Sequence, residues 1–396
     1  MSNSDPIVIV GAARTPMGGF QGDFASLTSP ELGGAAIKEA LNRAGVKGED
    51  VDEVVMGIVL PAGVGQAPAR QASANAGIPW DKGCTTVNKM CGSGMKATMF
   101  AHDAILAGSN DIMIAGGMES MTNAPYLMEK ARAGFRMGHG KVMDHMFLDG
   151  LEDAYDKGRL MGTFAEDTAQ HYQFTREEQD NFAISSLKRA QEAIISGESA
   201  KEIVPVTVKT RKGETVVEQD EQPMKANLDK IPTLKPAFAK DGTVTAANSS
   251  SISDGGAALV LMRLSEAEKR GLTPIAKIHG HATDAREPQW FTTAPIGSIE
   301  KVLAKTGWSK DEVDLYEINE AFAVVTMCAM RDLDIPHDKV NVFGGACALG
   351  HPIGASGARI IVTLLNALKS KGGTKGVASL CIGGGEATAV AVELMN

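Results

Sequence analysis

Short apolar runs and amphipathic segments alternate along the chain, as they do where strands and helices follow one another. Residues 7–10 form an apolar run of strand length, and the next segment repeats apolar positions at helical spacing. We expect this helix to begin at the N-cap Ser29, with Pro30 in its first turn, and to end at Gly45. Residues 51–59 predict a second strand, so the chain opens as a strand–helix–strand unit.

The same order of features occurs again late in the chain. An amphipathic segment ends at Gly307 and is followed by a strand over residues 314–318, just as Gly45 precedes the strand 51–59. A second echo pairs Ala-Gly-Gly-Met-Glu at 115–119 with Ile-Gly-Gly-Gly-Glu at 382–386. The separations, 307 − 45 and 383 − 116, differ by only five positions. Either echo alone could be chance, but two in the same order favour duplication of a βα half.

Three segments follow from this repeat. The N-terminal half is expected over residues 1–120 and is completed by about 246–270, and the C-terminal half over 271–396. Residues 121–245 differ in texture, with charged loops, a helix around 177–195 and strands interrupted by proline. We interpret them as an inserted loop domain, where ligand recognition is expected because loops on a rigid scaffold usually carry it.

Composition narrows the classes of function. The 396 residues carry a net charge of −9 without a basic block, which argues against partners such as nucleic acid or an anionic membrane. No apolar stretch has transmembrane length, and residues 1–10 do not resemble a signal peptide. The five cysteines lack a CxxC pair, so neither a disulfide framework nor a zinc site is indicated. A cytoplasmic protein without a membrane partner is expected.

Cys91 is the first candidate for chemistry. It lies in a glycine-rich turn, between a strand-like run and a helix expected over residues 95–107 that ends at Gly108. A thiol at a helix N-terminus is predicted to have a lowered pKa, because unpaired N–H groups and the helix dipole stabilise the thiolate. The alternative is a small buried hydrophobic side chain, which is the usual role of a free cysteine.

The later half offers three possible partners for Cys91. Asn319 follows the strand 314–318, where α/β sites are built, although it could instead cap the next helix. His351 lies among the five glycines of residues 344–357 and precedes Pro352, which keeps it out of helical geometry. Cys381 leaves a buried strand into three glycines whose N–H groups could bind an oxyanion, but it could also be part of the core.

Other enzyme classes fit these residues less well. The loop 11–16 lacks the glycines of a dinucleotide fingerprint, which disfavours a nicotinamide dehydrogenase. A papain-like protease would use a Cys, a His and an Asn, but it has no use for a second reactive cysteine or a duplicated chain. The four candidates together therefore matter more than any one of them.

The blocks 87–94, 319–323, 350–357 and 380–385 resemble the signatures of the thiolase family in identity, order and spacing, and the similarity extends from residue 7 to 394. Within that family the chain is most similar to acetoacetyl-CoA thiolases (acetyl-CoA acetyltransferases). The resemblance implies an α/β, five-layer αβαβα fold built from two duplicated halves. It also implies reversible condensation of two acetyl-CoA to acetoacetyl-CoA and CoA.

The resemblance assigns a role to each candidate residue. Cys91 would carry the acyl group after His351 takes its proton, and backbone N–H groups of Cys91 and Gly383 would hold the oxyanion. Cys381 would remove a proton from the methyl group of acetyl-CoA. His351 and a water on Asn319 would then stabilise the enolate. The alternatives are a degradative 3-ketoacyl-CoA thiolase of fatty-acid β-oxidation for longer chains, a ketoacyl synthase and a non-enzymatic lipid carrier.

The family also implies the ligand and the assembly. Coenzyme A is expected as substrate and product, with no tightly bound cofactor and no metal, because Leu187 stands where some members have a tyrosine at a potassium site. The usual assembly is a dimer or a dimer of dimers, and we expect a homotetramer held through Arg132 and its neighbours. The positions expected to bind the acyl-CoA are Leu151, Met161, Lys225, Phe238, Ala246, Ser250, Phe291, Ala321 and Phe322.

Two departures from the family pattern affect the pocket. Leu160 replaces the histidine of the family's His-Met-Gly, which removes a polar contact near the thioester. Phe291 stands where many bacterial members have methionine, beside the bulky Trp290. Both changes bear on the preferred length and branching of the acyl chain.

Overall fold

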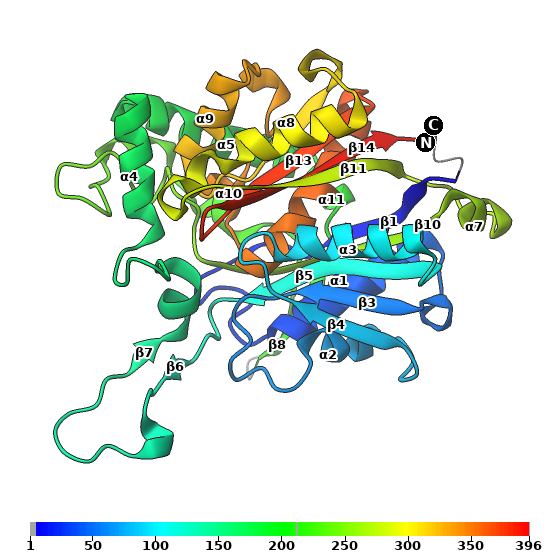
Figure 1. Cartoon of the computed structure of the whole chain (residues 1–396), viewed down its shortest axis with the longest axis horizontal. Coiled ribbons are helices and arrows are strands. Elements are labelled where there is room, and N and C mark those ends of the chain that lie inside the picture. Colours follow the sequence, from blue (N-terminus) through cyan, green and yellow to red (C-terminus); the bar gives the residue numbers. More distant parts are fainter. Residues whose placement is uncertain (1–4, 211–212, 396) are drawn as a thin grey trace.

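A ten-stranded mixed sheet forms the centre of the computed structural model, which describes residues 5–210 and 213–395 (Figure 1). Nine strands follow the order β12-β13-β14-β11-β1-β10-β5-β3-β4, and β2 pairs with β10. The strands are β1 (Ile7–Arg14), β2 (Gly18–Gly19), β3 (Glu53–Gly57), β4 (Gly83–Val87), β5 (Ile112–Ser120), β10 (Ser253–Arg263), β11 (Ala276–Ala285), β12 (Leu315–Ile318), β13 (Lys375–Ile382) and β14 (Glu386–Leu394).

The pairing of these strands repeats. In the first half β3 is parallel to β5, and β5, β10 and β1 follow as antiparallel neighbours. In the second half β12 is parallel to β13, and β13, β14 and β11 follow in the same way. The two halves meet where β1 pairs with β11 at Val8↔Lys277 and Ile9↔Ala276. The predicted duplication is confirmed at the level of strand order and direction.

Helices lie outside each half of the sheet and between the halves, which gives the expected five layers (Figure 1). On one outer face α1 (Ser29–Ala44) packs on β1 and β10, while α2 (Pro68–Asn75) packs on β3 and β4. On the opposite face α8 (Ala294–Thr306) packs on β11 and β14, beside α9 (Ala323–Asp332). Between the halves lie α3 (Ser93–Ala107) and α11 (Ile353–Lys371).

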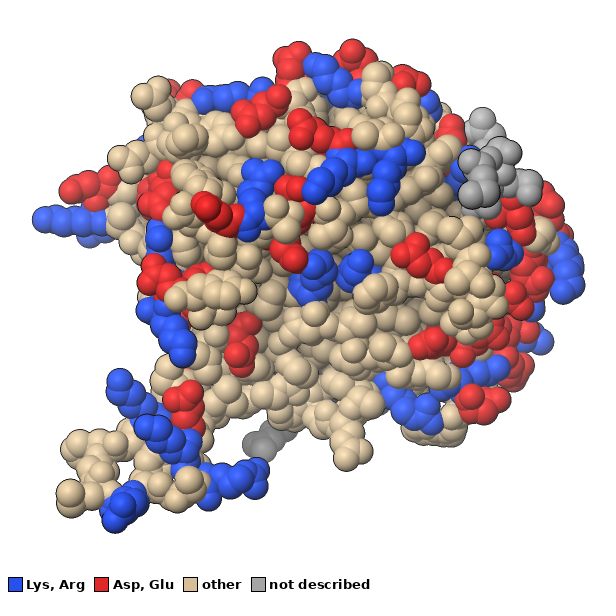
Figure 2. Space-filling model, viewed as in Figure 1, with Lys and Arg blue, Asp and Glu red and all other residues tan. Residues whose placement is uncertain are grey.

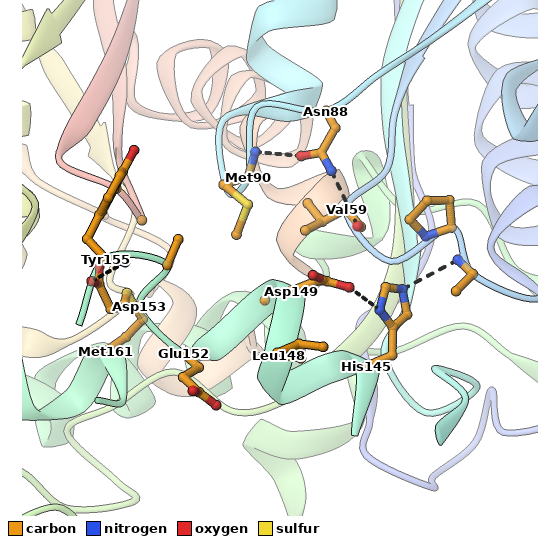
Figure 3. A pocket seen from close by; sticks show the side chains of 16 residues that line it. Val59, Asn88, Met90, His145, Leu148, Asp149, Glu152, Asp153, Tyr155 and Met161 are labelled. Atoms are coloured by element: carbon orange, nitrogen blue, oxygen red, sulfur yellow. Dashed lines mark hydrogen bonds and ion pairs between the residues drawn. The ribbon is translucent and has the colours of Figure 1, made fainter. Parts of the chain in front are cut away.

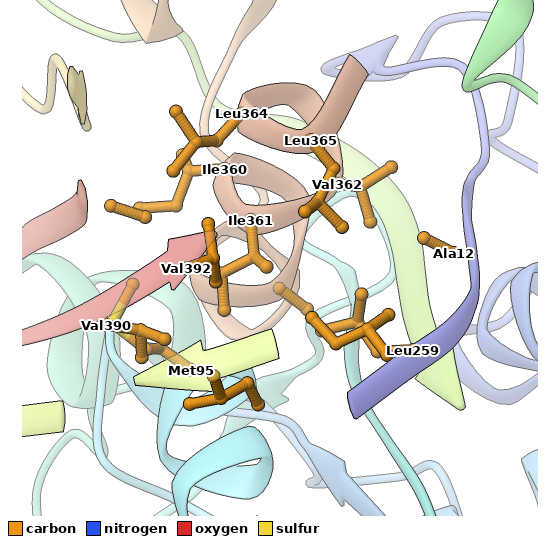
Figure 4. Close-up of a cluster of buried hydrophobic side chains, with 14 of the residues drawn as sticks. Ala12, Met95, Leu259, Ile360, Ile361, Val362, Leu364, Leu365, Val390 and Val392 are labelled. Atoms are coloured by element: carbon orange, nitrogen blue, oxygen red, sulfur yellow. The ribbon is translucent and has the colours of Figure 1, made fainter. Parts of the chain in front are cut away.

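The two central helices approach each other through glycine. A Cβ at Gly94 would lie 2.8 Å from the backbone nitrogen of Ala358, and one at Gly357 would lie 2.4 Å from that of Met95. Around this contact a buried cluster combines side chains from both halves (Figure 4), among them Met95, Leu259, Ile360, Val390 and Val392. Close packing of α3 on α11 therefore fixes the start of each helix relative to the other.

Most predicted elements are found, with different boundaries. The helix α1 ends at Gly45 and α8 at Gly307, both glycines having left-handed backbone, with φ of 67° and 72°. The predicted N-cap of α1 is wrong: Thr28 is the cap and forms a capping box with Glu31. Ser29 is buried in the first turn instead, where its hydroxyl accepts the N–H of Ser120.

Residues between β5 and β10 form helices and two small hairpins beside the layers. The helices are α4 (Met161–Tyr172), α5 (Arg176–Ile195) and α6 (Glu221–Lys225), and one hairpin joins β8 (Val206–Thr210) to β9 (Gly213–Val217). The hairpin of β6 (Tyr126–Leu127) and β7 (Met143–Asp144) carries an arm that projects from the body (Figure 1). The predicted domain boundaries stay a prediction, and residues 1–4, 211–212 and 396 lie outside the described residues.

No helix in the described ranges is long and apolar enough to cross a membrane. The small helices α7 (Leu264–Lys269) and α10 (Ala346–Leu349) complete the fold, and α10 leads directly into the glycine-rich turn that holds His351.

Candidate active site

Four turns from both halves meet at the carboxyl ends of the strands. Cys91 lies between β4 and α3, and Asn319 directly follows β12. His351 lies between α10 and α11, and Cys381 is near the end of β13. A Cβ at Gly92 would lie 2.5 Å from the side chain of Ile382, so the Cys91 turn rests on the end of β13. The fold thus brings together residues that are up to 290 positions apart (381 − 91).

The turn before Cys91 is strained and braced. Met90 has a positive φ of 47°, which is unusual for a side chain of its size. Its N–H donates to the side-chain oxygen of Asn88 at 2.9 Å (Figure 3), and its carbonyl accepts the hydroxyl of Ser93 at 2.6 Å. These bonds hold the backbone so that the Cys91 sulfur faces the end of β13.

The predicted effect of the helix N-terminus on Cys91 is outweighed by burial. Backbone N–H groups of Gly383 and of Cys91 itself lower the pKa of the thiol, but burial raises the pKa to about 11. The expectation of a lowered pKa is therefore wrong for the free protein. Both N–H groups act on the sulfur, and their predicted role in holding an oxyanion stays a prediction.

His351 is arranged as a neutral base. Its Nδ1 lies 2.5 Å from the hydroxyl oxygen of Ser356, and that hydroxyl donates its own proton to the Pro352 carbonyl at 3.0 Å. Nδ1 must therefore carry the proton, which leaves the lone pair on Nε2. Nε2 is buried and has no protein partner. Burial and, second, the charge of Arg359 lower the pKa of His351 to about 3, so the imidazole is neutral near pH 7.

Asn319 presents an amide nitrogen to the same region. Its backbone N–H donates to Ser379 at 3.0 Å, and its side-chain oxygen accepts from Arg359 at 3.3 Å. The side-chain nitrogen is buried and has no protein partner. Asn319 does not cap a helix, because α9 begins at Ala323 with Phe322 as its N-cap.

Cys381 is buried in an apolar cluster that includes Phe291 and Phe322. Burial, and second the charge of Cys91, raise the pKa of its thiol well above the usual value. The Cys91 turn rests on Ile382, the residue after Cys381, so the two cysteines lie near each other. Cys381 is thus both a core residue and close enough to the nucleophile to share a substrate with it.

Two cavities open beside these residues. The larger, of about 660 Å³, is drawn in Figure 3 and is lined by Met90, Met161, Gly383 and Gly384, with His145 and Asp149 at one side. There His145 Nδ1 lies 2.7 Å from the Asp149 carboxylate, and Nε2 accepts the N–H of Ala62 at 3.4 Å. The smaller, of about 240 Å³, is lined by residues of α5, α6, α10 and the β9–β10 connection, among them Leu187, Lys230, Ala246, Ser251 and Cys347.

The structure brings most of the predicted acyl-CoA-binding residues to these cavities or to the cysteines. Leu151 packs in the cluster of Cys91, and Met161 lines the larger cavity. The backbone N–H of Ser250 donates to Ala321 at 2.9 Å, and Ala246 lines the smaller cavity. The others pack in the cluster of Cys381, and they are Phe238, Phe291, Ala321 and Phe322.

Lys225 lies apart from this set. Its ammonium group is exposed and pairs with Glu221 at 2.7 Å, so it lines neither cavity. Lys230 is the lysine that lines the smaller one. The role of Lys225 stays a prediction, and Lys230 is a second basic residue for an anionic ligand.

Sequence reasoning missed four residues that hold the site, which are Asn88, Glu119, Ser356 and Arg359. Glu119 is fully buried near the end of β5, and its carboxylate accepts the N–H groups of Val59, Leu60 and Gly354. Burial raises the pKa of Glu119 to about 7. A carboxylate inside an apolar strand is costly, so it was a signal for such a role.

One group in the described part of the chain could hold a metal ion, consisting of His102, Asp103 and His281. Both imidazoles already bond to the Asp103 carboxylate, at 3.0 and 2.8 Å. Lys96 and Lys305 add positive charge nearby, which disfavours a cation. The group lies on α3 and β11 and lines neither cavity, and the predicted absence of a metal stays a prediction.

A nucleophilic thiol, a neutral imidazole, a second thiol and inward N–H donors define an acyl-transfer enzyme that works through a cysteine. The comparisons agree with that class. Residues 7–265 match the family described as Thiolase, N-terminal domain, and residues 272–394 match Thiolase, C-terminal domain. The chain belongs to the thiolase family.

Relatives from distant organisms are similar over nearly the whole chain. An acetyl-CoA acetyltransferase of Cupriavidus necator is 48% identical over 98% of this chain and 99% of its own. Acetyl-CoA acetyltransferase 2 of Arabidopsis thaliana is 51% identical over 99% and 98%. The crystal structure of the Bacillus anthracis acetyl-CoA acetyltransferase superposes with a TM-score of 0.96 at 41% identity, covering 99% of each chain. The predicted fold and family are confirmed.

Proposed function

We propose that the protein is an acetyl-CoA C-acetyltransferase, which condenses two acetyl-CoA to acetoacetyl-CoA and CoA and catalyses the reverse thiolysis. The observation that carries this proposal is that the Cys91 turn rests on Ile382, next to Cys381, while the unpartnered Nε2 of His351 and amide nitrogen of Asn319 belong to residues that share Arg359 as a neighbour. Relatives described as acetyl-CoA acetyltransferases, 47 to 51% identical over almost the full length, support the same activity.

The first half-reaction transfers an acetyl group to Cys91. His351 Nε2 takes the thiol proton, and the thiolate attacks the thioester carbonyl. The N–H groups of Cys91 and Gly383 hold the oxyanion, since both already point at the sulfur. CoA leaves as a thiolate and receives the proton from His351. Because His351 is neutral near pH 7, it can accept that proton without first losing another.

The second half-reaction forms the carbon–carbon bond. His351 Nε2 takes the proton of the Cys381 thiol, and the resulting thiolate removes a proton from the methyl group of a second acetyl-CoA. His351, now protonated at Nε2, and a water on Asn319 donate to the enolate oxygen, for which an uncharged amide nitrogen is suited. The carbanion attacks the acetyl carbon on Cys91, and the Cys91 sulfur leaves as a thiolate that receives the proton from His351. The high pKa of Cys381 makes it a strong base once ionised, which a weakly acidic methyl group requires.

The two cavities suit the parts of an acyl-CoA. The apolar cluster around Phe238 and Phe322 offers walls for the pantetheine arm. Lys230 at the smaller cavity could meet a phosphate, and Lys225 remains the candidate that the sequence offered. Coenzyme A would act as substrate and product, with no cofactor held permanently.

A longer acyl chain is less suited to this pocket. The ring of Phe291 is buried and packs edge to face on Phe164, with the ring centres 6.2 Å apart, in the cluster of Cys381. A bulky, fixed ring next to the reacting carbons leaves little room for extension. A degradative thiolase for long chains is therefore the second candidate and is not favoured by the relatives.

The deciding experiment is thiolysis of acetoacetyl-CoA by the purified protein, with Cys91→Ala beside wild type. We expect turnover in wild type and its loss in the variant, because no acyl-enzyme can form without the sulfur. Cys84→Ala is the matched control, since Cys84 is also partly buried but lines neither cavity. Undiminished thiolysis by Cys91→Ala would refute the proposed function.

A substrate series then separates the two candidates. We expect kcat/KM to fall from acetoacetyl-CoA to 3-ketohexadecanoyl-CoA, with 2-methylacetoacetyl-CoA as a test of branching. Phe291→Met, which introduces the residue of many bacterial members, should reduce the difference in kcat/KM between short-chain and long-chain substrates. Preference of the wild-type protein for the long chain would show that the degradative activity is the right one.

The assembly and the compartment are also proposed. We propose a homotetramer, a dimer of dimers, held through the arm of residues 128–142. Arm side chains Phe135, Met137 and Val142 are exposed, and its basic residues form the cluster at the lower left of Figure 2, which are Lys130, Arg132, Arg136 and Lys141. Five cysteines without a disulfide support a reducing compartment such as the cytosol.

A further inference from the structure

Arg359 links the central helix α11 to the strand that carries Asn319. Its side chain is fully buried, and it donates from Nη1 to the Glu317 carboxylate at 3.1 Å. From Nη2 it donates to the side-chain oxygen of Asn319 at 3.3 Å. Glu317, on β12, is also buried. A single guanidinium thus holds two residues of one strand end.

This contact decides which way the Asn319 amide faces. The two ends of an asparagine amide have nearly the same shape, so only their partners distinguish them. A guanidinium has donors and no acceptor, and it therefore requires the oxygen of Asn319 to face it. The nitrogen must then face the opposite side, where it has no protein partner. A flipped amide would present an oxygen on that side and set its NH₂ donors against the donors of Arg359.

We infer that Arg359, held by Glu317, is the positioning residue for Asn319, and that it fixes the amide with its nitrogen toward the substrate. The inference rests on the proposed function, in which that nitrogen supports the enolate oxygen through a water. An enolate oxygen needs a donor, and an amide free to rotate would offer its acceptor part of the time. Arg359 does not touch the substrate and orients the donor through Asn319, while its charge, which also lowers the pKa of His351, is kept when lysine replaces it.

A second buried arginine provides a matched control. Arg14, on β1, has 1% of its side chain exposed, like Arg359, and pairs with Glu202 at 2.5 Å and Asp220 at 2.6 Å. Its side chain bonds to Thr15, Glu202 and Asp220, and none of these bonds reaches a cysteine, His351 or Asn319. Loss of a buried ion pair should destabilise the fold at either position, whereas loss of amide orientation should occur only at Arg359.

The experiment compares Arg359→Lys with Arg14→Lys in wild-type background. Lysine keeps the charge, but its single nitrogen cannot hold a carboxylate and an amide as the planar fork does. For Arg359→Lys we expect kcat for thiolysis to fall on the order of tenfold to a hundredfold, with KM for CoA nearly unchanged. Arg14→Lys should lower the melting temperature about as much as Arg359→Lys does, but it should keep kcat within about twofold of the wild-type value. Equal losses of kcat in both variants would overturn the inference.

The rate of the acyl-transfer half-reaction separates the two roles, because a structural defect would slow it together with thiolysis. Exchange of label between CoA and acetyl-CoA needs Cys91 and His351 but forms no enolate. We expect Arg359→Lys to keep most of this exchange while thiolysis falls. Parallel loss of both rates would mean that Arg359 supports the fold and not the amide.

A double-mutant cycle closes the argument. With Asn319→Ala, the amide is already lost, so adding Arg359→Lys should cost less than about twofold more in kcat. Multiplication of the two single losses in kcat would show that Arg359 does not act through Asn319.

If Arg359→Lys does not fold, the double variant Glu317→Gln/Arg359→Gln removes both charges of this ion pair together, so neither partner is left as an unpaired charge. Wild-type kcat in that folded variant would equally overturn the inference. Failure of wild-type thiolysis would instead refute the proposed function, so the two failures are distinguishable.

Discussion

The site contains two of the buried side-chain polar atoms that lack a protein partner in the described residues. Nε2 of His351 and the amide nitrogen of Asn319 have no protein partner, although most buried polar groups in proteins are paired. Leaving such a group unpaired costs about 1–3 kcal/mol. The structure accepts this cost at two neighbouring residues whose other side-chain atoms are firmly bonded, to Ser356 and Arg359. Such an arrangement suits groups that bond only to a substrate or a transition state.

The pKa of Cys91 gives a prediction for the free protein. A thiol is neutral below its pKa and a thiolate above it, and burial raises the pKa of Cys91 to about 11. Alkylation by iodoacetamide should therefore accelerate about tenfold per pH unit between about pH 7 and 10, without a plateau. Subtraction of the rate measured with Cys91→Ser removes the contribution of Cys84. A plateau near pH 7 would show that the N–H donors outweigh burial after all.

At the scale of elements, the site depends on the contact between α3 and α11. Cys91 precedes α3 and His351 precedes α11, so a shift of one helix along the other would separate them. The contact is close only because Gly94 and Gly357 lack a Cβ. Glycine inside a helix normally costs about 1 kcal/mol relative to alanine. The helices accept this cost to bring the two catalytic turns together.

Gly357→Ala tests this contact. Alanine would favour an isolated helix, but here its Cβ would lie 2.4 Å from the backbone nitrogen of Met95 and force α3 away. We expect a loss of about 1–3 kcal/mol in the free energy of unfolding, with lower activity. Gly372→Ala is the control, because that glycine ends α11 with a positive φ of 71° and open space around it. It should cost about 1–2 kcal/mol through backbone strain and leave kcat unchanged. Wild-type activity and stability in Gly357→Ala would contradict this role.

At the scale of the whole molecule, neither half contains a complete site. The first half supplies Cys91, the second supplies His351, Asn319 and Cys381, and the segment between them supplies walls such as Met161 and Phe238. Duplication has therefore produced two similar halves with different chemical tasks. The arm of residues 128–142 projects beyond both halves (Figure 1), and none of its residues lines either cavity of the site.

Removal of the arm should separate assembly from catalysis. Leu127 and Met143 pair across the hairpin, so an Asn-Gly turn can replace residues 128–142 without disturbing β6 and β7. If the arm joins two dimers, light scattering should give half the mass of the wild-type protein, with kcat within a few-fold. A charge-reversal variant, Arg132→Glu/Arg136→Glu, keeps the arm and should weaken the same contact. An unchanged mass in both variants would disprove the proposed tetramer contact.

The amino-acid sequence by itself determined the repeat, most of the elements and the four reactive side chains. Periodic apolar positions, helix-ending glycines such as Gly45 and Gly307, and glycine-rich turns are local signals, and local signals can be seen in the chain. Only the tertiary structure decided the protonation of Cys91, the tautomer of His351 and the orientation of Asn319. Those depend on burial and on partners such as Ser356 and Arg359, which come from other turns and helices. Glu119 could be noticed in its strand, but the three N–H groups that it binds belong to segments that only the fold brings together.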